Sequence, residues 1–287
     1  MDKQKINIIA KDGAIIPTIT VGIEDINKKG IVIISHGFGE HAGSYVELAE
    51  DLLKAGYASI IPDQRGHGQP PEGAKNWHGK TPGYQYFVED IISLTKTVQE
   101  MAPDTPIALY GHSMGGNIVI NTLLRTSPQQ TSTYFCAVIE SPWFGLYNPP
   151  GSFMVAVTKL LSIIMPNYRF NRELEHKKLS SDIERAGNYS RDPLYHGYIS
   201  MRMLSGIINA CDFAMENAEK LPISVYLAYA NNDLIVCNKE IHKFAERAGD
   251  MVTIKEYASN HAIHNDEIRE TYCNDVIAFM DKHIQSM

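Results

Sequence analysis

The sequence predicts an α/β fold in which a mostly parallel central sheet has helices on both faces and carries an inserted helical cap. Short β-rich runs alternate along the chain with segments of helical periodicity, which is the pattern typical of such a sheet. Several runs are almost continuously apolar, as strands buried on both faces are. The alternation stops after Gly145 and resumes at Ser224. We therefore expect a core formed by residues 1–144 and 219–287, with residues 145–218 inserted as a helical cap, or lid.

The expected elements begin with an antiparallel pair of strands. These are Ile6–Ala10 and Ala14–Val21, which turn at Asp12-Gly13. Apolar residues at helical spacing separate the later runs, as in residues 87–98, and the last helix is expected over residues 266–283. The remaining strands are expected at Ile31–Ser35, Ala58–Pro62, Ile107–Gly111, Cys136–Glu140, Ser224–Tyr229 and Thr253–Tyr257.

Composition restricts the classes of partner. The 287 residues are 44% hydrophobic, enough for a sizeable core, and their formal net charge is -7. Because charged residues of both signs are mixed without a basic patch, we expect no nucleic-acid partner. The N-terminal residues lack the apolar stretch of a signal peptide, and no run reaches the roughly 18 apolar residues of a membrane span. A cytoplasmic protein is expected, with peripheral contact at membranes left open.

The cysteines do not indicate a disulfide framework or a zinc site. They are far apart in the sequence and include no Cys-x-x-Cys pair. Packing in the core is the expected role of these residues, Cys136, Cys211, Cys237 and Cys273.

The segment 111–115, Gly-His-Ser-Met-Gly, matches the nucleophile elbow Gly-x-Ser-x-Gly. In this motif a sharp turn between a strand and a helix exposes the serine oxygen, and the glycines remove side chains that would collide. The segment follows an expected buried strand and precedes a helical run over residues 117–124, which is the context that the motif requires. It favours the α/β-hydrolase fold with Ser113 as the nucleophile. The alternative is an ordinary glycine-rich bend between a strand and a helix.

A second glycine-containing loop fits the oxyanion hole of such an enzyme. His36-Gly37-Phe38-Gly39 follows directly after the strand expected at Ile31–Ser35. Such a loop supplies one backbone N–H to the negative oxygen of a tetrahedral intermediate, and the residue after the nucleophile supplies the other. The expected donors are therefore the amides of Phe38 and Met114. The alternative is a flexible loop that needs two glycines for its turn.

The order serine, acid, histidine along the chain locates the remaining catalytic residues. His261 lies four residues after Tyr257, near the end of the last strand, and is the expected general base. His264 is the alternative base, and a metal-binding His-x-x-His pair is a further alternative without a suitable Cys or Glu nearby. Asp233 follows the preceding strand and is expected to orient the histidine, with Glu140 as the rival acid.

These roles predict nucleophilic acyl chemistry. His261 takes the proton of Ser113, the serine attacks an acyl carbonyl, the two amides hold the oxyanion, and water cleaves the acyl-enzyme. No metal or organic cofactor is required. Transfer of the acyl group to another acceptor stays open beside hydrolysis.

Together these residues resemble the monoacylglycerol lipase and lysophospholipase group of α/β-hydrolases, which is also grouped with serine aminopeptidase-like proteins. The resemblance spans nearly the whole chain and rests on segments 36–45, 63–68 and 111–116 and on the Asp233 and His261 loops. It implies a serine carboxylic-ester hydrolase for lipid-like acyl esters, in the first place monoacylglycerols. A lysophospholipase or a broad carboxylesterase is the alternative.

The resemblance also implies substrate-binding residues. Glu40, Tyr189 and His264 would lie near the alcohol end of the substrate, although each could equally be a structural hydrogen-bonding residue. The sequence departs from the family pattern at Gln69, where a serine is usual, and at Ser44, where an arginine is often found. The glycine that commonly precedes the acid loop is also absent. These departures bear on the substrate and not on the catalytic residues.

The segment 152–165 predicts an amphipathic lid helix. Its apolar residues share one helical face, so the helix could touch a membrane surface, and the alternative is a cap helix packed on its neighbours or a dimer contact. Two other functions are weighed against an esterase: an aminopeptidase, and a non-catalytic small-molecule receptor that keeps the fold. The sequence does not indicate an oligomeric state.

Overall fold

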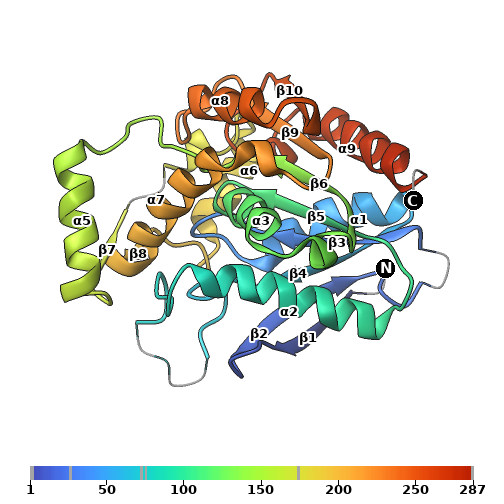
Figure 1. Cartoon of the computed structure of the whole chain (residues 1–287), viewed down its shortest axis with the longest axis horizontal. Helices are drawn as coiled ribbons and strands as arrows, with labels where there is room; N and C mark the ends of the chain where they lie inside the picture. The colour runs from blue at the N-terminus through green and yellow to red at the C-terminus, as the bar shows by residue number, and fades with distance from the viewer. Residues whose placement is uncertain (1–2, 26–27, 72–73, 75, 173–174, 286–287) are drawn as a thin grey trace.

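An eight-stranded sheet runs through the molecule (Figure 1). The computed structural model describes residues 3–25, 28–71, 74, 76–172 and 175–285. The strand order is β1-β2-β4-β3-β5-β6-β9-β10, antiparallel across β1, β2 and β4 and parallel elsewhere. The strands are β1 (Lys3–Ile9), β2 (Ile15–Val21), β3 (Gly30–Ser35), β4 (Tyr57–Pro62), β5 (Ile107–His112), β6 (Tyr134–Glu140), β9 (Val225–Ala230) and β10 (Val252–Tyr257). The expected mostly parallel sheet is confirmed.

Helices cover both faces of this sheet and bury a separate apolar core on each. Because side chains alternate along a strand, Ile31 and Ile33 of β3 enter one core, while Val32 and Ile34 enter the other. This explains why the central strands are apolar throughout. The first core contains α2 (Gln85–Met101), α3 (Met114–Arg125), α7 (Met201–Glu216) and α8 (Asn238–Ala248), and the second contains α1 (Val46–Lys54) and α9 (Arg269–Ile284).

The segment between β6 and β9 is mainly helical, and it also contains a small sheet. Strands β7 (Arg169–Asn171) and β8 (Tyr198–Ser200) pair antiparallel, and they lie with α5 (Ser152–Ile164) at one end of the molecule (Figure 1). Helix α6 (Ile183–Arg191) lies between them in the chain. Helix α7 belongs to the expected cap range, yet it packs against α3 and contributes to the first core.

The last helix begins later than its apolar pattern suggested. It starts at Arg269 rather than at Asp266, because the Asp266 carboxylate accepts hydrogen bonds from Ser259 and from the amide of Asn260. These contacts hold the preceding residues in a turn. Among the described residues, no helix is both long enough and apolar enough to span a bilayer.

Candidate active site

Ser113 lies at the turn between β5 and α3, in a strained backbone conformation. Its φ of 53° and ψ of -114° fall in a region that residues other than glycine rarely adopt. The surrounding structure enforces this conformation, because the Ser113 amide donates to the carbonyl of Glu140 at 2.9 Å and the Ser113 carbonyl accepts from Asn117 at 3.1 Å. The serine side chain is thereby held at the carboxyl edge of the sheet.

Two glycines allow the chain to pack around this turn. A Cβ on Gly111 would lie 2.4 Å from the carbonyl oxygen of Gly115, and a Cβ on Gly115 would lie 2.0 Å from the carbonyl oxygen of Ser35. Both distances are shorter than any ordinary contact. The start of α3 can therefore approach the end of β3, and with it the loop that contains Phe38, only because position 115 has no side chain.

His261 and Asp233 meet in the loops that follow β10 and β9. His261 Nδ1 lies 2.6 Å from Asp233 Oδ2, and both side chains are buried. The other carboxylate oxygen of Asp233 accepts the amides of Ile235 at 2.8 Å and Val236 at 2.9 Å. Asp233 is thus held by its own loop and lies in hydrogen-bond contact with the imidazole ring of His261.

The pKa of His261 is raised above its ordinary value. Burial acts in the opposite direction, because it disfavours the charged ring, but the Asp233 carboxylate outweighs it through charge and hydrogen bonding. Glu40 and Glu140 add smaller contributions of the same sign. The ring is therefore suited to accept a proton and to stabilise the imidazolium that results.

The rival acid and the rival base form a pair of their own. His264 Nδ1 lies 2.9 Å from Glu140 Oε2 and 3.0 Å from Oε1, and the His264 amide donates to Oε1 at 3.1 Å. Tyr110 also donates to Glu140. Burial alone would raise the pKa of Glu140, but His264 and His112 lower it to about 2. Glu140 therefore orients His264, whereas Asp233 orients His261.

The Phe38 amide, one of the two backbone donors expected in the oxyanion hole, belongs to the loop after β3, which hydrogen bonds hold in place. Glu40 Oε2 accepts the Gly37 amide at 2.7 Å and the Tyr45 hydroxyl at 2.5 Å, which fixes the loop on both sides of Phe38. The Met114 amide lies in the first turn of α3, where backbone N–H groups have no helical partner. Among the described residues, no acceptor is recorded for either the Phe38 or the Met114 amide.

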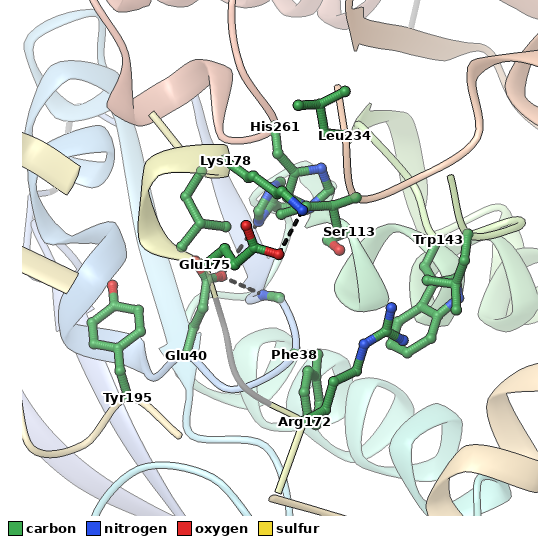
Figure 2. A pocket seen from close by; sticks show the side chains of 15 residues that line it. Phe38, Glu40, Ser113, Trp143, Arg172, Glu175, Lys178, Tyr195, Leu234 and His261 are labelled. Carbon is green, nitrogen blue, oxygen red and sulfur yellow. Dashed lines mark hydrogen bonds and ion pairs between the residues drawn. The ribbon is translucent and has the colours of Figure 1, made fainter. Parts of the chain in front are cut away.

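A cavity of about 120 Å³ opens over Ser113 and His261. Figure 2 shows Glu40 and Tyr195 on one side of it, and Phe38, Arg172 and Trp143 on the other. Apolar side chains supply much of the wall, while Arg172, Glu175 and Lys178 bring charge to it. The lining residues are Gly37, Phe38, Glu40, His112, Ser113, Trp143, Leu146, Arg172, Glu175, Lys178, Leu179, Tyr195, Leu234, Ile235 and His261.

Of the three residues expected near the alcohol end, only Glu40 lines this cavity. Tyr189 and His264 are buried and do not belong to the described lining. Glu40 Oε1, His112 Nε2 and His264 Nε2 are nevertheless buried without a hydrogen-bond partner in the described part of the chain. Two of these unpartnered atoms thus belong to residues that line the cavity, Glu40 and His112, and the third belongs to His264 close to it.

Sequence reasoning missed several residues that line the cavity, namely Trp143, Arg172, Lys178 and Tyr195. All four come from the segment between β6 and β9, where no motif marks them. Tyr195 donates its hydroxyl to Ser44 Oγ at 2.5 Å. Ser44, at which the sequence departs from the expected family pattern, is therefore hydrogen-bonded to a residue of the cavity lining.

One group of three described residues has donor atoms close enough for a shared metal ion, namely His112, Glu140 and His264. Both oxygens of Glu140 already accept protein hydrogen bonds, and all three residues are buried. The arrangement fits a structural hydrogen-bond network that supports the loops around Ser113.

Comparisons with known proteins agree with this architecture. The family model for serine aminopeptidase S33 matches residues 26–268. A monoacylglycerol lipase from Mycolicibacterium smegmatis is 26% identical over 263 residues, which cover 91% of each chain. The crystal structure of Paleococcus ferrophilus monoacylglycerol lipase matches with a TM-score of 0.80 and 25% identity, covering 99% of this chain and 100% of that one. An uncharacterized abhydrolase domain-containing protein of Dictyostelium discoideum is 24% identical over 258 residues, and the chain spans only 26% of its length.

The sheet order and these matches define the molecule as an enzyme of the α/β-hydrolase class. More narrowly, the chain belongs to the serine aminopeptidase S33 family, whose model covers most of its length. The family resemblance that the motifs indicated is thereby confirmed.

The close approach at Gly115 leads to a prediction about stability. Gly115→Ala should destabilise the fold by about 3 kcal/mol or more, lowering Tm by about 6–12 °C, because its Cβ would meet backbone that cannot turn away. Gly151→Ala is the matched control, since a Cβ there has no atom within 4 Å. Thermal unfolding followed by circular dichroism measures both, and equal Tm values for the two variants would contradict the packing argument.

Proposed function

We propose that the protein hydrolyses carboxylic esters of lipids, in the first place monoacylglycerols, with Ser113 as nucleophile, His261 as general base and Asp233 as the residue that orients His261. The observation that carries this proposal is the buried Asp233–His261 pair, whose histidine lines the same cavity as the strained Ser113. A receptor that keeps the fold has no need of this combination.

The geometry supports a mechanism in two steps. His261 Nε2 accepts the Ser113 proton while Oγ attacks the ester carbonyl, and the amides of Phe38 and Met114 stabilise the oxyanion. His261 then protonates the leaving alcohol, and an acyl-enzyme remains. In the second step His261 takes a proton from water, which attacks the acyl-enzyme and releases the carboxylic acid and the free serine. Asp233 keeps Nδ1 of His261 protonated, so that Nε2 is the basic nitrogen.

The choice of lipid esters is supported by the relatives and by the cavity wall. Two of the relatives described above are monoacylglycerol lipases, and much of the wall beside Ser113 is apolar, as at Leu146, Leu179 and Leu234. The alcohol portion is proposed to lie on the side of Glu40, with Tyr189 and His264 behind it. Glu40 Oε1, Tyr189 Oη and His264 Nε2 are buried there without a protein hydrogen-bond partner, which supports a role for this side in binding hydroxyl groups once a substrate displaces the surrounding side chains.

The second candidate is a carboxylesterase for short acyl chains. The cavity of about 120 Å³ is smaller than the roughly 300–1,000 Å³ typical of ligand pockets. A long acyl chain would fit only if residues 145–218 act as a cap that moves. A series of monoacylglycerols from short to long chain distinguishes the candidates, because each methylene that enters an acyl tunnel contributes about 0.8 kcal/mol.

Helix α5 carries an apolar surface suited to a lipid interface. It packs on α7, while Phe153 is 80% exposed and Ile163 is 79% exposed, with Leu160 and Ile164 also exposed beside them. Such a surface is unusual in a soluble monomer and is typical of segments that contact a membrane or a partner. We propose transient contact with a membrane surface through this helix.

The nucleophile is tested by Ser113→Ala, which should lower turnover of a monoacylglycerol by about four to six orders of magnitude because the triad acts as a unit. Ser141→Ala is the matched control. Ser141 is also buried and also has a positive φ, but it does not line the cavity. Activity should survive in the control, and both variants should keep their Tm. Near-native turnover by Ser113→Ala would assign the chemistry to another residue.

The raised pKa of His261 predicts the pH profile. The protonated ring cannot accept the serine proton, so kcat/KM for a neutral ester should rise with pH, with its midpoint above the ordinary histidine value of about 6.5. Asp233→Asn should move the midpoint down and lower kcat by about 10³-fold or more, since it removes the main charge that raises this pKa. Glu140→Gln, which contacts His264 instead, should have the smaller effect on both quantities. The reverse ranking would make Glu140 the orienting acid.

The membrane contact is tested by Leu160→Ser combined with Ile164→Ser. Both residues are exposed, at 55% and 65%, so the fold should be unaffected. Hydrolysis of long-chain monoacylglycerols in vesicles should fall by about tenfold, while hydrolysis of a short soluble ester should not change. Ile183→Ser, at a residue that is 89% exposed on another helix, is the control. Equal losses on both substrates would indicate a packing role for α5.

A further inference from the structure

Two cationic side chains line the cavity over Ser113. Arg172 directly follows β7, and Lys178 lies in the short 3-10 helix His176–Lys178 before α6. Neither belongs to the residues that the proposed chemistry uses. A pocket that received only neutral esters would have no need of a guanidinium beside its apolar wall.

The positive charge of Arg172 has no oppositely charged partner within the described ranges, which leave out residues 173–174. Nearby cations differ from it in this respect: Lys178 pairs with Glu175 at 2.6 Å, and Arg169 donates to the carbonyl of His78 at 2.8 Å. No ion pair or side-chain hydrogen bond is recorded for the Arg172 guanidinium. Although the residue as a whole is exposed, partial desolvation lowers the pKa of Arg172, and an arginine remains charged nonetheless.

The two sides of the cavity differ in electrostatic character. On the side of Tyr195, Glu40 is an anion, because His112 holds the pKa of this buried carboxyl well below its usual range against the opposing effect of burial. Arg172 lies on the other side, with Phe38 and Trp143 (Figure 2). Glu175 also lines the cavity, but Lys178 pairs with it at 2.6 Å. A negative group on a substrate would be repelled from Glu40 and attracted to Arg172.

The chain as a whole is acidic, with a formal net charge of -7. A positive group at the opening of a pocket raises the local concentration of anions, even on an acidic protein. A guanidinium that is partly removed from water gains more from a carboxylate or phosphate than a fully hydrated one, because less hydration has to be given up.

We propose that this site accepts esters that carry an anionic group, a carboxylate or a phosphate, a few bonds from the ester carbonyl, with Arg172 as the contact. The inference rests on the proposed ester hydrolysis and specifies its substrate class. The reaction stays the same: water and the ester give a carboxylic acid and an alcohol, and the anionic group is bound but not altered.

Matched pairs of short-chain esters test the proposal. One pair compares butyryl glycerol with butyryl glycerol phosphate, which places the anion on the alcohol. The other compares nitrophenyl butyrate with the nitrophenyl monoester of glutaric acid, which places it on the acyl chain. The measured quantity is the ratio of kcat/KM for the anionic and neutral member of each pair.

Arg172→Gln should lower this ratio by at least about tenfold for one of the two pairs, because a hydrogen-bonded ion pair is lost, and Lys178→Gln should lower it less. The pair that responds identifies the end of the substrate that carries the charge. Lys177→Gln is the matched control, because Lys177 is the exposed neighbour of Lys178 and does not line the cavity. It should leave both ratios unchanged. An unchanged ratio in Arg172→Gln, or a change as large in Lys177→Gln, would overturn the proposal.

A binding measurement separates this inference from the proposed hydrolysis. Calorimetric titration of Ser113→Ala with butyryl glycerol phosphate and with the glutarate monoester needs no turnover. Tighter binding than that of the neutral esters, lost in Ser113→Ala combined with Arg172→Gln, would support the anion site even if the wild-type enzyme hydrolysed none of these esters. Binding that does not depend on Arg172 would overturn the proposal even if ester hydrolysis were fully established.

Discussion

The site depends on carboxylates that are buried at the carboxyl edge of the sheet and paired with histidines. A buried carboxylate is costly unless it is paired and hydrogen-bonded, and here each one also accepts at least one backbone amide. These amides belong to the loops after β3, β9 and β10, so the same contacts that satisfy the charges hold the loops in place. The pairs are Asp233 with His261, Glu140 with His264 and Glu40 with His112.

Two of these pairs, Asp233–His261 and Glu140–His264, come together through the third, Glu40–His112. The ring of His112 lies 4.7 Å from that of His261 and 5.1 Å from that of His264, so the pairs pack against each other. His112 and His261 line the cavity with Ser113, whereas His264 does not belong to its described lining. The Glu140–His264 pair supports the floor of the site from behind, where its charge also contributes to the raised pKa of His261.

The cavity has a floor at the strand ends around Ser113 and walls from the segment between β6 and β9. The floor follows strand ends and is fixed by backbone geometry at Ser113 and Gly115, whereas Arg172, Lys178 and Tyr195 come from short turns and from the surroundings of a two-stranded sheet. Substrate discrimination is therefore expected to depend on the wall, and the chemistry on the floor. Members of one family can have the same floor residues and still differ in their substrates, because their wall residues differ.

The sequence alone was sufficient to predict those features that depend on interactions between residues close together in the chain. Strands buried on both faces must be apolar throughout, and the glycines around Ser113 must leave room for a sharp turn, so both leave a pattern in the sequence. The approximate ends of the strands place Ser113, Asp233 and His261 at one edge of a parallel sheet, so the sequence alone could predict that these residues lie near one another.

Tertiary structure decided what depends on contacts between distant segments. The pairing of Glu140 with His264 joins residues 124 positions apart, and nothing in either local pattern distinguishes it from a pairing with His261. The same holds for Tyr195, which meets Ser44 across 151 positions, for Arg172 at the cavity wall, and for the exposed apolar face of α5. Periodicity shows that a helix has an apolar face, but only packing determines whether that face is covered, because coverage depends on neighbours that the helix does not encode.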